Sequence, residues 1–361
     1  MTPRRTLLPA ILATFTLALA GCTDPGPLKT REPAATTAAG TAAPSDPAEG
    51  APTELAAFYE QELEWGECGP DLTCTDVEVP LDYGDPAGET IRIAVSRMDT
   101  AGEGAPALFL NPGGPGGSGT AMLEWITFSI SGEVLEEYNL VGFDPRGVNL
   151  STAVDCISDA ELDDWRSAAV DTATLEGLQE YSAEMEEFGE NCAANTGELL
   201  GHVDTDSVAR DLDILRAAVG ESETLDYLGY SYGTFLGAVY AGLFPERVGR
   251  FVLDGAVDPA LSISGLALGQ AAGFEAALRA YMEDCLGSEG CPFSGSVDDG
   301  LARLRQLLDL VRVTPLPTGE PDRPLTYPLA VSGIILPMYE DAIWPQLTAA
   351  LDAALNGNDG S

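Results

Sequence analysis

A serine that stands between two glycines is the residue of this sequence best placed to do chemistry. Residues 229–233 read GYSYG and fit the pattern G-x-S-x-G. A short apolar segment precedes Ser231 and a helical pattern follows it, which is the context that a nucleophile elbow requires. The turn from strand to helix needs small residues beside the serine and lifts its hydroxyl above the sheet. We therefore predict that Ser231 is a nucleophile and that the N–H of Tyr232 faces a developing oxyanion.

A second motif, NPGGPGGSG at 111–119, follows the apolar segment 107–110. Acyl transfer needs a second N–H donor for the oxyanion, and glycines let a backbone loop approach a substrate without a side-chain clash. The alternative is a phosphate-binding loop. The motif lacks both the Lys-Ser/Thr ending of a Walker loop and the spacing of a dinucleotide fingerprint.

The elements around these motifs alternate between short strands and helices. Residues 91–96 alternate apolar and polar side chains, as in a strand, whereas 208–219 and 236–243 have the apolar spacing of helices. Further short apolar segments, typical of buried strands, lie at 107–110, 140–143, 225–230 and 251–253. This alternation predicts a mostly parallel sheet with helices on both faces.

The sequence pattern changes after Pro259. No further strand is evident there, and we predict helices at 265–286, 298–312 and 342–355. These helices either pack the core or form a cap over the strand ends. We favour the cap, because no strand lies between them to pair with the sheet.

The N-terminal residues have the features of a processing signal. Arg4 and Arg5 precede an apolar segment at 7–20, which is too short to span a bilayer comfortably. The segment ends in LAGC, which resembles the bacterial lipobox and predicts lipidation of Cys22. The alternative is an ordinary secretory signal with a chance cysteine. We expect a signal peptide at 1–21, an Ala/Thr/Pro-rich disordered tether at 22–53, and an exported protein anchored to the cell membrane only through Cys22.

Six of the seven cysteines remain once Cys22 is set aside. An even number in an exported protein favours disulfides, although free buried thiols are the alternative and the sequence does not fix the connectivity. Local closure suggests the pairs Cys68–Cys74, Cys156–Cys192 and Cys285–Cys291.

Composition excludes several classes of function. The 361 residues carry a formal net charge of −41, which argues against nucleic acid or an anionic membrane surface as a partner. A hydrophobic content of 45% against 21% charged residues excludes a wholly disordered chain. The single histidine, His202, excludes a multi-histidine metal site, and we predict neither a metal nor a cofactor.

Taken together, the motifs at 111–119, 143–147 (FDPRG), 211–216 (DLDILR) and 229–255 resemble those of α/β-hydrolase peptidases. The resemblance is greatest to the secreted bacterial tripeptidyl aminopeptidases, relatives of proline iminopeptidase, and covers about residues 60 to 355. It implies an α/β-hydrolase fold, with the N-terminal part of the core at 54–263 and a partial helical cap at 264–361.

The resemblance also implies roles for individual residues. Ser231 would form an acyl-enzyme, and the N–H groups of Gly114 and Tyr232 would form the oxyanion hole. The substrates would be short peptides or protein N-termini whose free amino group is held by acidic side chains of the cap. The candidates are Glu275, Glu283, Asp284, Glu340 and Asp341; the alternative for each is a solvated charge on a helix face. Asp144 and Arg146 would form a structural ion pair or fix their turn.

The chain departs from the family in one respect. In α/β-hydrolases the triad order is serine, acid, histidine, yet no histidine follows Ser231. The resemblance implies that two C-terminal strands, the acid and the base are missing. His202 precedes Ser231 and is in the wrong order to replace the base, and Asp254 or Asp258 would be an acid without a base. We expect this chain alone to be inactive or weakly active and marginally stable, with an exposed strand edge. An esterase or lipase and an inert binding remnant are the alternatives.

Overall fold

The computed structural model of the chain describes residues 48, 50–221 and 223–361. The predicted signal peptide, Cys22 and most of the predicted tether lie outside the described residues. Among the helices that are described, none has both the length and the apolar character needed to cross a membrane.

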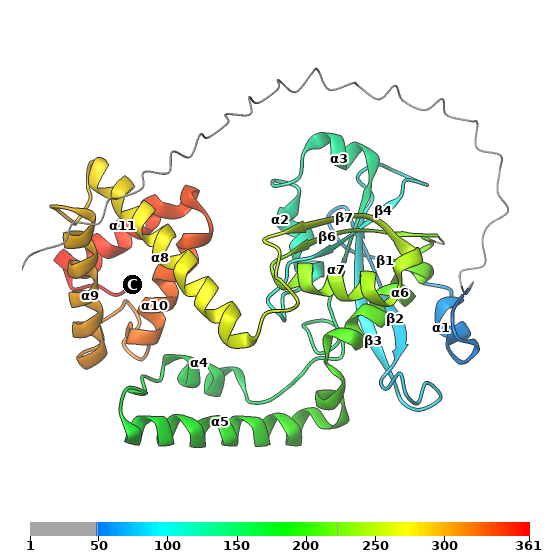
Figure 1. Ribbon diagram of the computed structural model, residues 1–361, viewed down its shortest axis with the longest axis horizontal. Coiled ribbons are helices and arrows are strands. Elements are labelled where there is room, and N and C mark those ends of the chain that lie inside the picture. The colour runs from blue at the N-terminus through cyan, green and yellow to red at the C-terminus, as the bar shows by residue number, and fades with distance from the viewer. Residues whose placement is uncertain (1–47, 49, 222) are drawn as a thin grey trace, which may run out of the picture. The chain divides into compact units, whose positions relative to one another are not determined.

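Seven strands form one sheet in the order β1-β2-β3-β5-β4-β6-β7 (Figure 1). The strands are β1 (Gly66–Gly69), β2 (Leu72–Pro80), β3 (Thr90–Met98), β4 (Ala107–Asn111), β5 (Asn139–Phe143), β6 (Leu225–Tyr230) and β7 (Val248–Asp254). β1, β2 and β3 pair antiparallel, β3 pairs antiparallel with β5, and the remaining pairs are parallel. The predicted strands and the mostly parallel sheet are confirmed.

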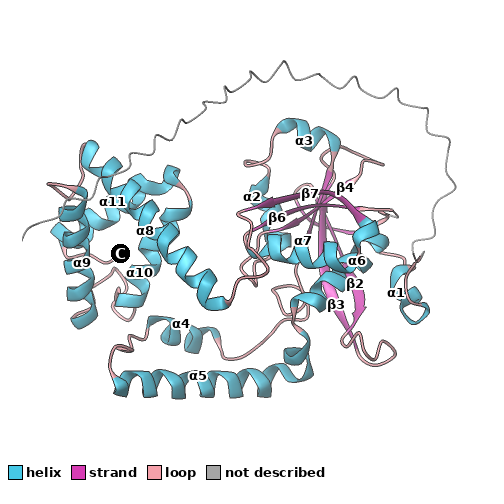
Figure 2. Cartoon of the chain, viewed as in Figure 1, coloured by secondary structure: helices cyan, strands magenta, loops and turns pink. Residues whose placement is uncertain are grey.

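Helices precede, connect and follow these strands. They are α1 (Ala56–Tyr59), α2 (Gly119–Ile126), α3 (Gly132–Glu137), α4 (Asp159–Ser167), α5 (Leu175–Thr196), α6 (Thr205–Val219), α7 (Tyr232–Leu243), α8 (Ile263–Gly287), α9 (Val297–Val313), α10 (Tyr327–Ile335) and α11 (Trp344–Asp352). After β7 the described chain contains no strand, only helices and loops apart from one isolated bridge between Leu316 and Leu325 (Figure 2).

The buried strands carry apolar side chains on both faces, because successive residues of a strand point to opposite sides. In β4, Phe109 belongs to the hydrophobic cluster that contains side chains of α6 and α7. Its neighbours Leu108 and Leu110 belong to a second cluster, with Met122 and Leu123 of α2. Near-continuous apolar strands therefore mark a sheet that is covered by helices on both faces.

A third hydrophobic cluster is built only from residues that follow β7. It contains Tyr281 of α8, Leu304 of α9, Ile334 of α10 and Leu347 of α11. The helices predicted for this part of the chain pack on one another through this cluster, and α10 joins them.

Three disulfides are present, and the predicted connectivity is confirmed. The pairs are Cys68–Cys74, Cys156–Cys192 and Cys285–Cys291. Cys68–Cys74 links β1 to β2, and Cys285–Cys291 links the end of α8 to the loop that follows it; each of these pairs is separated by 6 residues. Cys156–Cys192 spans 36 residues and links the segment before α4 to α5.

β7 forms one edge of the described sheet and pairs only with β6. Two apolar residues near the C-terminal end of β7 are exposed to solvent: Val252 is 58% exposed and Leu253 is 37% exposed. Phe251, on the face of β7 opposite to Val252, packs on Tyr227 and Tyr240. The described sheet thus has the exposed edge that the sequence led us to expect.

Candidate active site

Ser231 lies on a tight turn between β6 and α7. Its backbone has φ 53° and ψ −120°, a conformation that costs energy for any residue with a side chain. The turn is fixed from both sides, because the N–H of Ser231 donates to the carbonyl of Asp254 (2.9 Å) and the N–H of Thr234 donates to the carbonyl of Ser231 (2.9 Å). The predicted strand–turn–helix context of the serine is confirmed.

The two glycines of the motif are required by backbone contacts. A Cβ at Gly229 would lie 2.5 Å from the carbonyl oxygen of Gly233. A Cβ at Gly233 would lie 2.7 Å from the carbonyl oxygen of Asn111, at the end of β4. Both distances are too short for a side chain, so only glycine lets β6, α7 and the end of β4 approach one another here.

The glycine-rich segment 111–119 packs directly on the serine turn. A Cβ at Gly113 would lie 2.3 Å from the carbonyl oxygen of Tyr230 and 3.2 Å from Cβ of Ser231. The N–H of Gly113 donates to Oδ1 of Asn111 (2.9 Å), and the N–H of Gly117 donates to the carbonyl of Gly113 (3.0 Å). These hydrogen bonds give the loop a defined shape beside the nucleophile.

The two N–H groups predicted to form the oxyanion hole are those of Gly114 and Tyr232. Within the described ranges neither N–H has a hydrogen-bond acceptor. Both residues line the same pocket as Ser231. The predicted role requires both of these properties, donors without a backbone acceptor and a position at the pocket of Ser231.

The pocket at Ser231 has a volume of about 270 Å³ and is largely apolar. Phe235 and Leu261 line it together with Ile263 and Leu266 from the start of α8. Sequence reasoning did not find these two α8 residues as part of the site. The available signal was that apolar side chains open a helix close behind the strand that follows the nucleophile.

Asp258 and Gln270 add polar groups to the same pocket. Oδ1 of Asp258 accepts from the N–H of Ala260 (2.8 Å). Among the described residues, Asp258 is the only carboxylate that lines this pocket.

The acidic residues proposed from the family resemblance lie elsewhere. Glu275 forms an ion pair with Arg279 (2.8 Å), which also pairs with Asp298 of α9 (2.9 Å). The other four are exposed, and none of the five lines the described pocket at Ser231; they are Glu283, Asp284, Glu340 and Asp341. Their role in holding an amino group remains a prediction.

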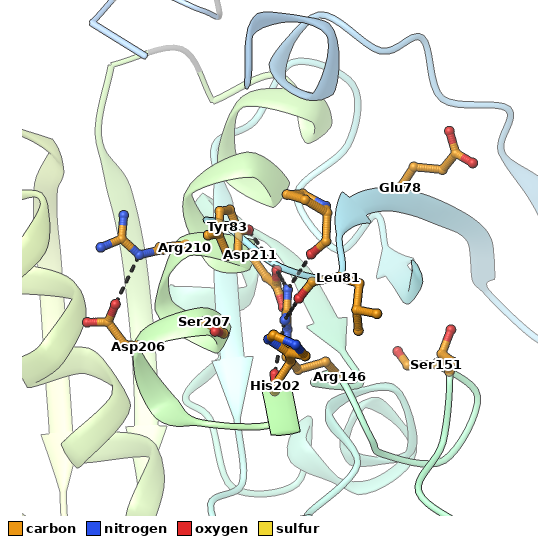
Figure 3. A network of polar contacts seen from close by, with 12 residues as sticks. Glu78, Leu81, Tyr83, Arg146, Ser151, His202, Asp206, Ser207, Arg210 and Asp211 are labelled. Atoms are coloured by element: carbon orange, nitrogen blue, oxygen red, sulfur yellow. Dashed lines mark hydrogen bonds and ion pairs between the residues drawn. The ribbon is translucent and has the colours of Figure 1, made fainter. Parts of the chain in front are cut away.

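Asp144 and Arg146 do not pair with each other. Arg146 is buried and makes a two-pronged ion pair with Asp211 (2.6 and 2.7 Å), and it donates to the carbonyls of Leu81 and His202 (Figure 3). Burial disfavours the charged guanidinium, but the hydrogen bonds and charge of Asp211 outweigh it and raise the pKa of Arg146. The ion-pair interpretation of the turn is wrong, because Arg146 has its partner on α6, distant in sequence.

Asp144 instead fixes its turn, as the second interpretation held. Its carboxylate is buried and accepts from the side chains of Ser118 (2.6 Å) and Asn149 (2.9 Å). His202, the only imidazole of the chain, touches this region through its carbonyl and does not line the described pocket at Ser231.

The phenol of Tyr232 ties the nucleophile turn to α6. Its hydroxyl shares a hydrogen bond with Oγ1 of Thr205 (2.7 Å), the first residue of α6. Burial raises the pKa of Tyr232 although that hydrogen bond opposes the shift. The phenol is therefore neutral near pH 7 and acts here as an anchor for the backbone beside Ser231.

A family model for the alpha/beta hydrolase fold matches residues 106–323, which include both glycine motifs. The chain belongs to the α/β-hydrolase fold family. Its sheet order, elbow and glycine loop are the family's arrangement of a nucleophile at the end of a strand.

Curated relatives in this family include peptidases and an esterase. Serine protease Hip1 of Mycobacterium tuberculosis is 37% identical over 309 residues, covering 81% of this chain and 59% of the relative. Tripeptidyl aminopeptidase of Streptomyces lividans is 39% identical over 223 residues, covering 59% of this chain and 41% of the relative. Carboxylesterase B of M. tuberculosis is 35% identical over 289 residues, covering 79% and 55%. This α/β-hydrolase chain thus spans less than two thirds of each of these relatives.

Proposed function

We propose that Ser231 is the nucleophile of a serine peptidase site that releases short peptides from peptide N-termini. The observation that carries this proposal is the strained turn at Ser231, which lines one pocket together with Gly114 and Tyr232, whose N–H groups have no backbone acceptor in the described chain. A serine held in this way beside two donors is the arrangement that acyl transfer needs.

The proposed chemistry begins with attack of Oγ of Ser231 on the carbonyl carbon of the substrate. The carbonyl oxygen becomes an oxyanion and accepts hydrogen bonds from the N–H groups of Gly114 and Tyr232. The amine then leaves with a proton, and the acyl group remains on Ser231 as an ester until water hydrolyses it. The fixed loop and turn place both donors before the charge develops, so no reorganisation is needed at that step.

The pocket suits a short, largely apolar acyl group. Phe235, Leu261, Ile263 and Leu266 supply the walls, and Asp258 supplies a carboxylate that a substrate ammonium group would neutralise. A free amino terminus close to the scissile bond carries such a charge. This composition supports the exopeptidase reading and offers Asp258 as a further candidate, beside the acidic residues of the helical region.

No imidazole lines the described pocket at Ser231, and Asp258 is the only carboxylate among the residues that line it. We therefore expect this chain alone to turn over substrate slowly, about 10⁶-fold below a site with a complete triad. Removal of the base slows hydrolysis of the acyl-enzyme as well as its formation, so a reactive ester should leave a lasting acyl group on Ser231.

This expectation gives a direct test of the proposal. The chain is incubated with p-nitrophenyl esters of a tripeptide with a free amino group, the same tripeptide N-acetylated, and a simple fatty acid, and adducts are mapped by mass spectrometry. We expect an adduct on Ser231 that is absent from Ser231→Ala and forms fastest with the free amino group. The lack of any adduct on Ser231 would contradict the proposal and favour an inert binding protein.

An esterase is the second candidate function. The mostly apolar lining of the pocket favours it, as does the similarity to a protein named carboxylesterase B. In the same experiment, faster acylation by the fatty acyl ester than by either peptide ester would favour the esterase over the peptidase.

We also propose that the protein is exported and held at the membrane by lipid on Cys22. The LAGC motif supports the anchor, and the three disulfides support an oxidising compartment. Metabolic labelling with a radioactive fatty acid in a bacterial host tests this directly. The label should be lost in Cys22→Ala; equal labelling of both proteins, or none of either, would contradict the anchor.

A further inference from the structure

A buried carboxylate lies directly behind the glycine loop. The side chain of Asp144 follows β5 and is 0% exposed. From the start of α2 it accepts hydrogen bonds from Oγ of Ser118 (2.6 Å), from the N–H of Thr120 (3.1 Å) and from Oγ1 of Thr120 (3.0 Å). From the loop after β5 it accepts from Nδ2 of Asn149 (2.9 Å) and the N–H of Leu150 (3.1 Å).

Asp144 differs from other buried acids because no cation faces it. The ion pairs of the described chain do not include Asp144, and Arg146, two residues away, pairs with Asp211. A buried charge without a cation is costly unless several hydrogen bonds compensate it. The donors from Ser118, Thr120, Asn149 and Leu150 and the positive end of the α2 dipole supply that compensation. The carboxylate therefore holds its donors in place, because the loss of any one donor would leave the buried charge less well compensated.

The donors from Ser118 and Thr120 lie at the C-terminal end of the glycine loop. Ser118 lies near the end of the glycine segment 111–119 and Thr120 follows it directly. The N–H of Gly117 donates to the carbonyl of Gly113, and Gly113 packs on Ser231. At the entrance, Asn111 holds the N–H of Gly113 through its side chain. The loop is thus fixed at both ends, by a neutral amide at the entrance and by a carboxylate at the exit.

We propose that Asp144 is a positioning residue whose ionised carboxylate holds the glycine loop, and with it the N–H of Gly114, in place beside Ser231. The inference rests on the proposed function for its catalytic meaning. The structural part of the proposal is that the order of the glycine loop depends on the carboxylate behind it. This part does not depend on catalysis and can be tested separately.

Amide hydrogen exchange of the full chain gives the first readout. The N–H of Thr120 is a direct partner of Asp144, whereas those of Gly113 and Gly117 are hydrogen-bonded only within the loop. In Asp144→Asn we expect Gly113 and Gly117 to exchange about tenfold faster or more, after correction for the change in global stability. Unchanged exchange at Gly113 and Gly117, with an effect at Thr120 alone, would overturn the proposal.

Asp211→Asn is the matched control. Asp211 is also buried and accepts from Arg146 and from the hydroxyl of Tyr83 (2.7 Å), without contact to the glycine loop. This variant should speed exchange around α6 and leave Gly113 and Gly117 at the wild-type rate once global stability is subtracted. Equal loop exchange in both variants would mean that Asp144 is merely structural.

A milder variant covers the case in which Asp144→Asn does not fold. Thr120→Val keeps the side-chain shape and the N–H but removes the hydroxyl that donates to Asp144. It should raise exchange at Gly113 and Gly117 in the same direction by a smaller factor, and no change at those two amides would overturn the proposal.

Acylation of Ser231 by a peptide ester is the second readout, and it separates the two proposals. We expect about a tenfold slower adduct in Asp144→Asn and little change in Asp211→Asn, at equal folded fraction. If the loop loosens but wild-type Ser231 never reacts, the proposed function fails and the positioning of the loop stands. If Ser231 reacts equally in both variants, the catalytic meaning of Asp144 is wrong.

Discussion

Two buried polar regions of the molecule differ in how their charges are compensated. On α6, Asp213 is fully buried and pairs with Arg216 (3.0 Å) and Arg247 (3.1 Å), while the hydroxyls of Tyr59 (2.7 Å) and Tyr240 (2.9 Å) donate to it. Beside the nucleophile, by contrast, Asp144 is compensated by neutral donors and the loops are closed by glycine contacts.

The difference in charge compensation corresponds to the segments that each region holds together. The Asp213 cluster joins segments that are far apart in sequence, since Tyr59 precedes the sheet and Arg247 precedes β7. It therefore fastens the chain around α6, and it raises the pKa of Tyr59 through burial and the nearby charge of Asp213. The region beside Ser231 joins short neighbouring loops and sets the position of individual N–H groups. Charge pairs thus hold the fold, and close packing with neutral donors holds the site.

The largest expected effect comes from breaking the Asp213 cluster. Asp213→Asn leaves the buried guanidinium of Arg216 and the partly buried guanidinium of Arg247 without their shared carboxylate, so we expect a loss of about 3–5 kcal/mol in the free energy of unfolding, measured with urea. The control is Asp206→Asn, which removes an exposed pair with Arg210 and should cost about 0.5 kcal/mol or less. Similar losses of stability in the two variants would contradict the claim that buried charge pairs hold the fold together.

A smaller loss of stability should follow from adding a methyl group at the tightly packed turn beside Ser231. Gly233→Ala places a Cβ against the backbone of Asn111 and should cost about 1–3 kcal/mol. Gly242→Ala on the same helix has open space around the added methyl and should be stabilising by about 0.5 kcal/mol. Urea unfolding of both variants measures this, and equal effects would mean that close packing does not define the turn.

The smallest expected effect concerns an exposed carboxylate. Asp204 caps α6: burial opposes its charge, but hydrogen bonds from the N–H and hydroxyl of Ser207 outweigh burial and lower the pKa of Asp204. Its contribution is thus present above the unfolded pKa and is lost as the pH falls through the lower folded value. Asp204→Ala should cost about 1 kcal/mol near pH 7 and progressively less below about pH 4.

Asp204→Asn is the control for this titration. An asparagine keeps a capping oxygen but does not ionise, so its stability relative to Asp204→Ala should not vary with pH. A pH-independent difference between the wild type and Asp204→Ala, measured by urea unfolding at several pH values, would rule out the ionised cap.

Local patterns in the sequence were sufficient to predict the inner strands and the elbow at Ser231, because these depend on residues close together in the chain, such as the apolar alternation of β3. Local closure suggested the disulfide pairs, although the sequence alone left their connectivity open and Cys156 and Cys192 are 36 residues apart. The helices α4 and α5 gave a weaker signal, because most of their residues are exposed and an apolar stripe is not needed there.

Tertiary contacts account for what the sequence could not predict. Arg146 pairs with Asp211, 65 residues away in the sequence, rather than with Asp144, which is only two residues away. The start of α8 lines the pocket at Ser231, although nothing in its own pattern distinguishes a pocket wall from a core-facing residue. The neutral compensation of Asp144 likewise depends on two segments, the start of α2 and the loop after β5, that meet only in the folded chain.

We propose that the fold positions Ser231 as a nucleophile, although no imidazole is among the residues that line the described pocket. Labelling with a fluorophosphonate probe, mapped by mass spectrometry on the folded chain, the urea-unfolded chain and Ser231→Ala, tests this most directly. The account predicts one slow adduct, on Ser231, that forms faster in the folded chain than in the unfolded chain and is absent from the variant. Equal rates in the folded and unfolded chains, or an adduct that persists in Ser231→Ala, would contradict it.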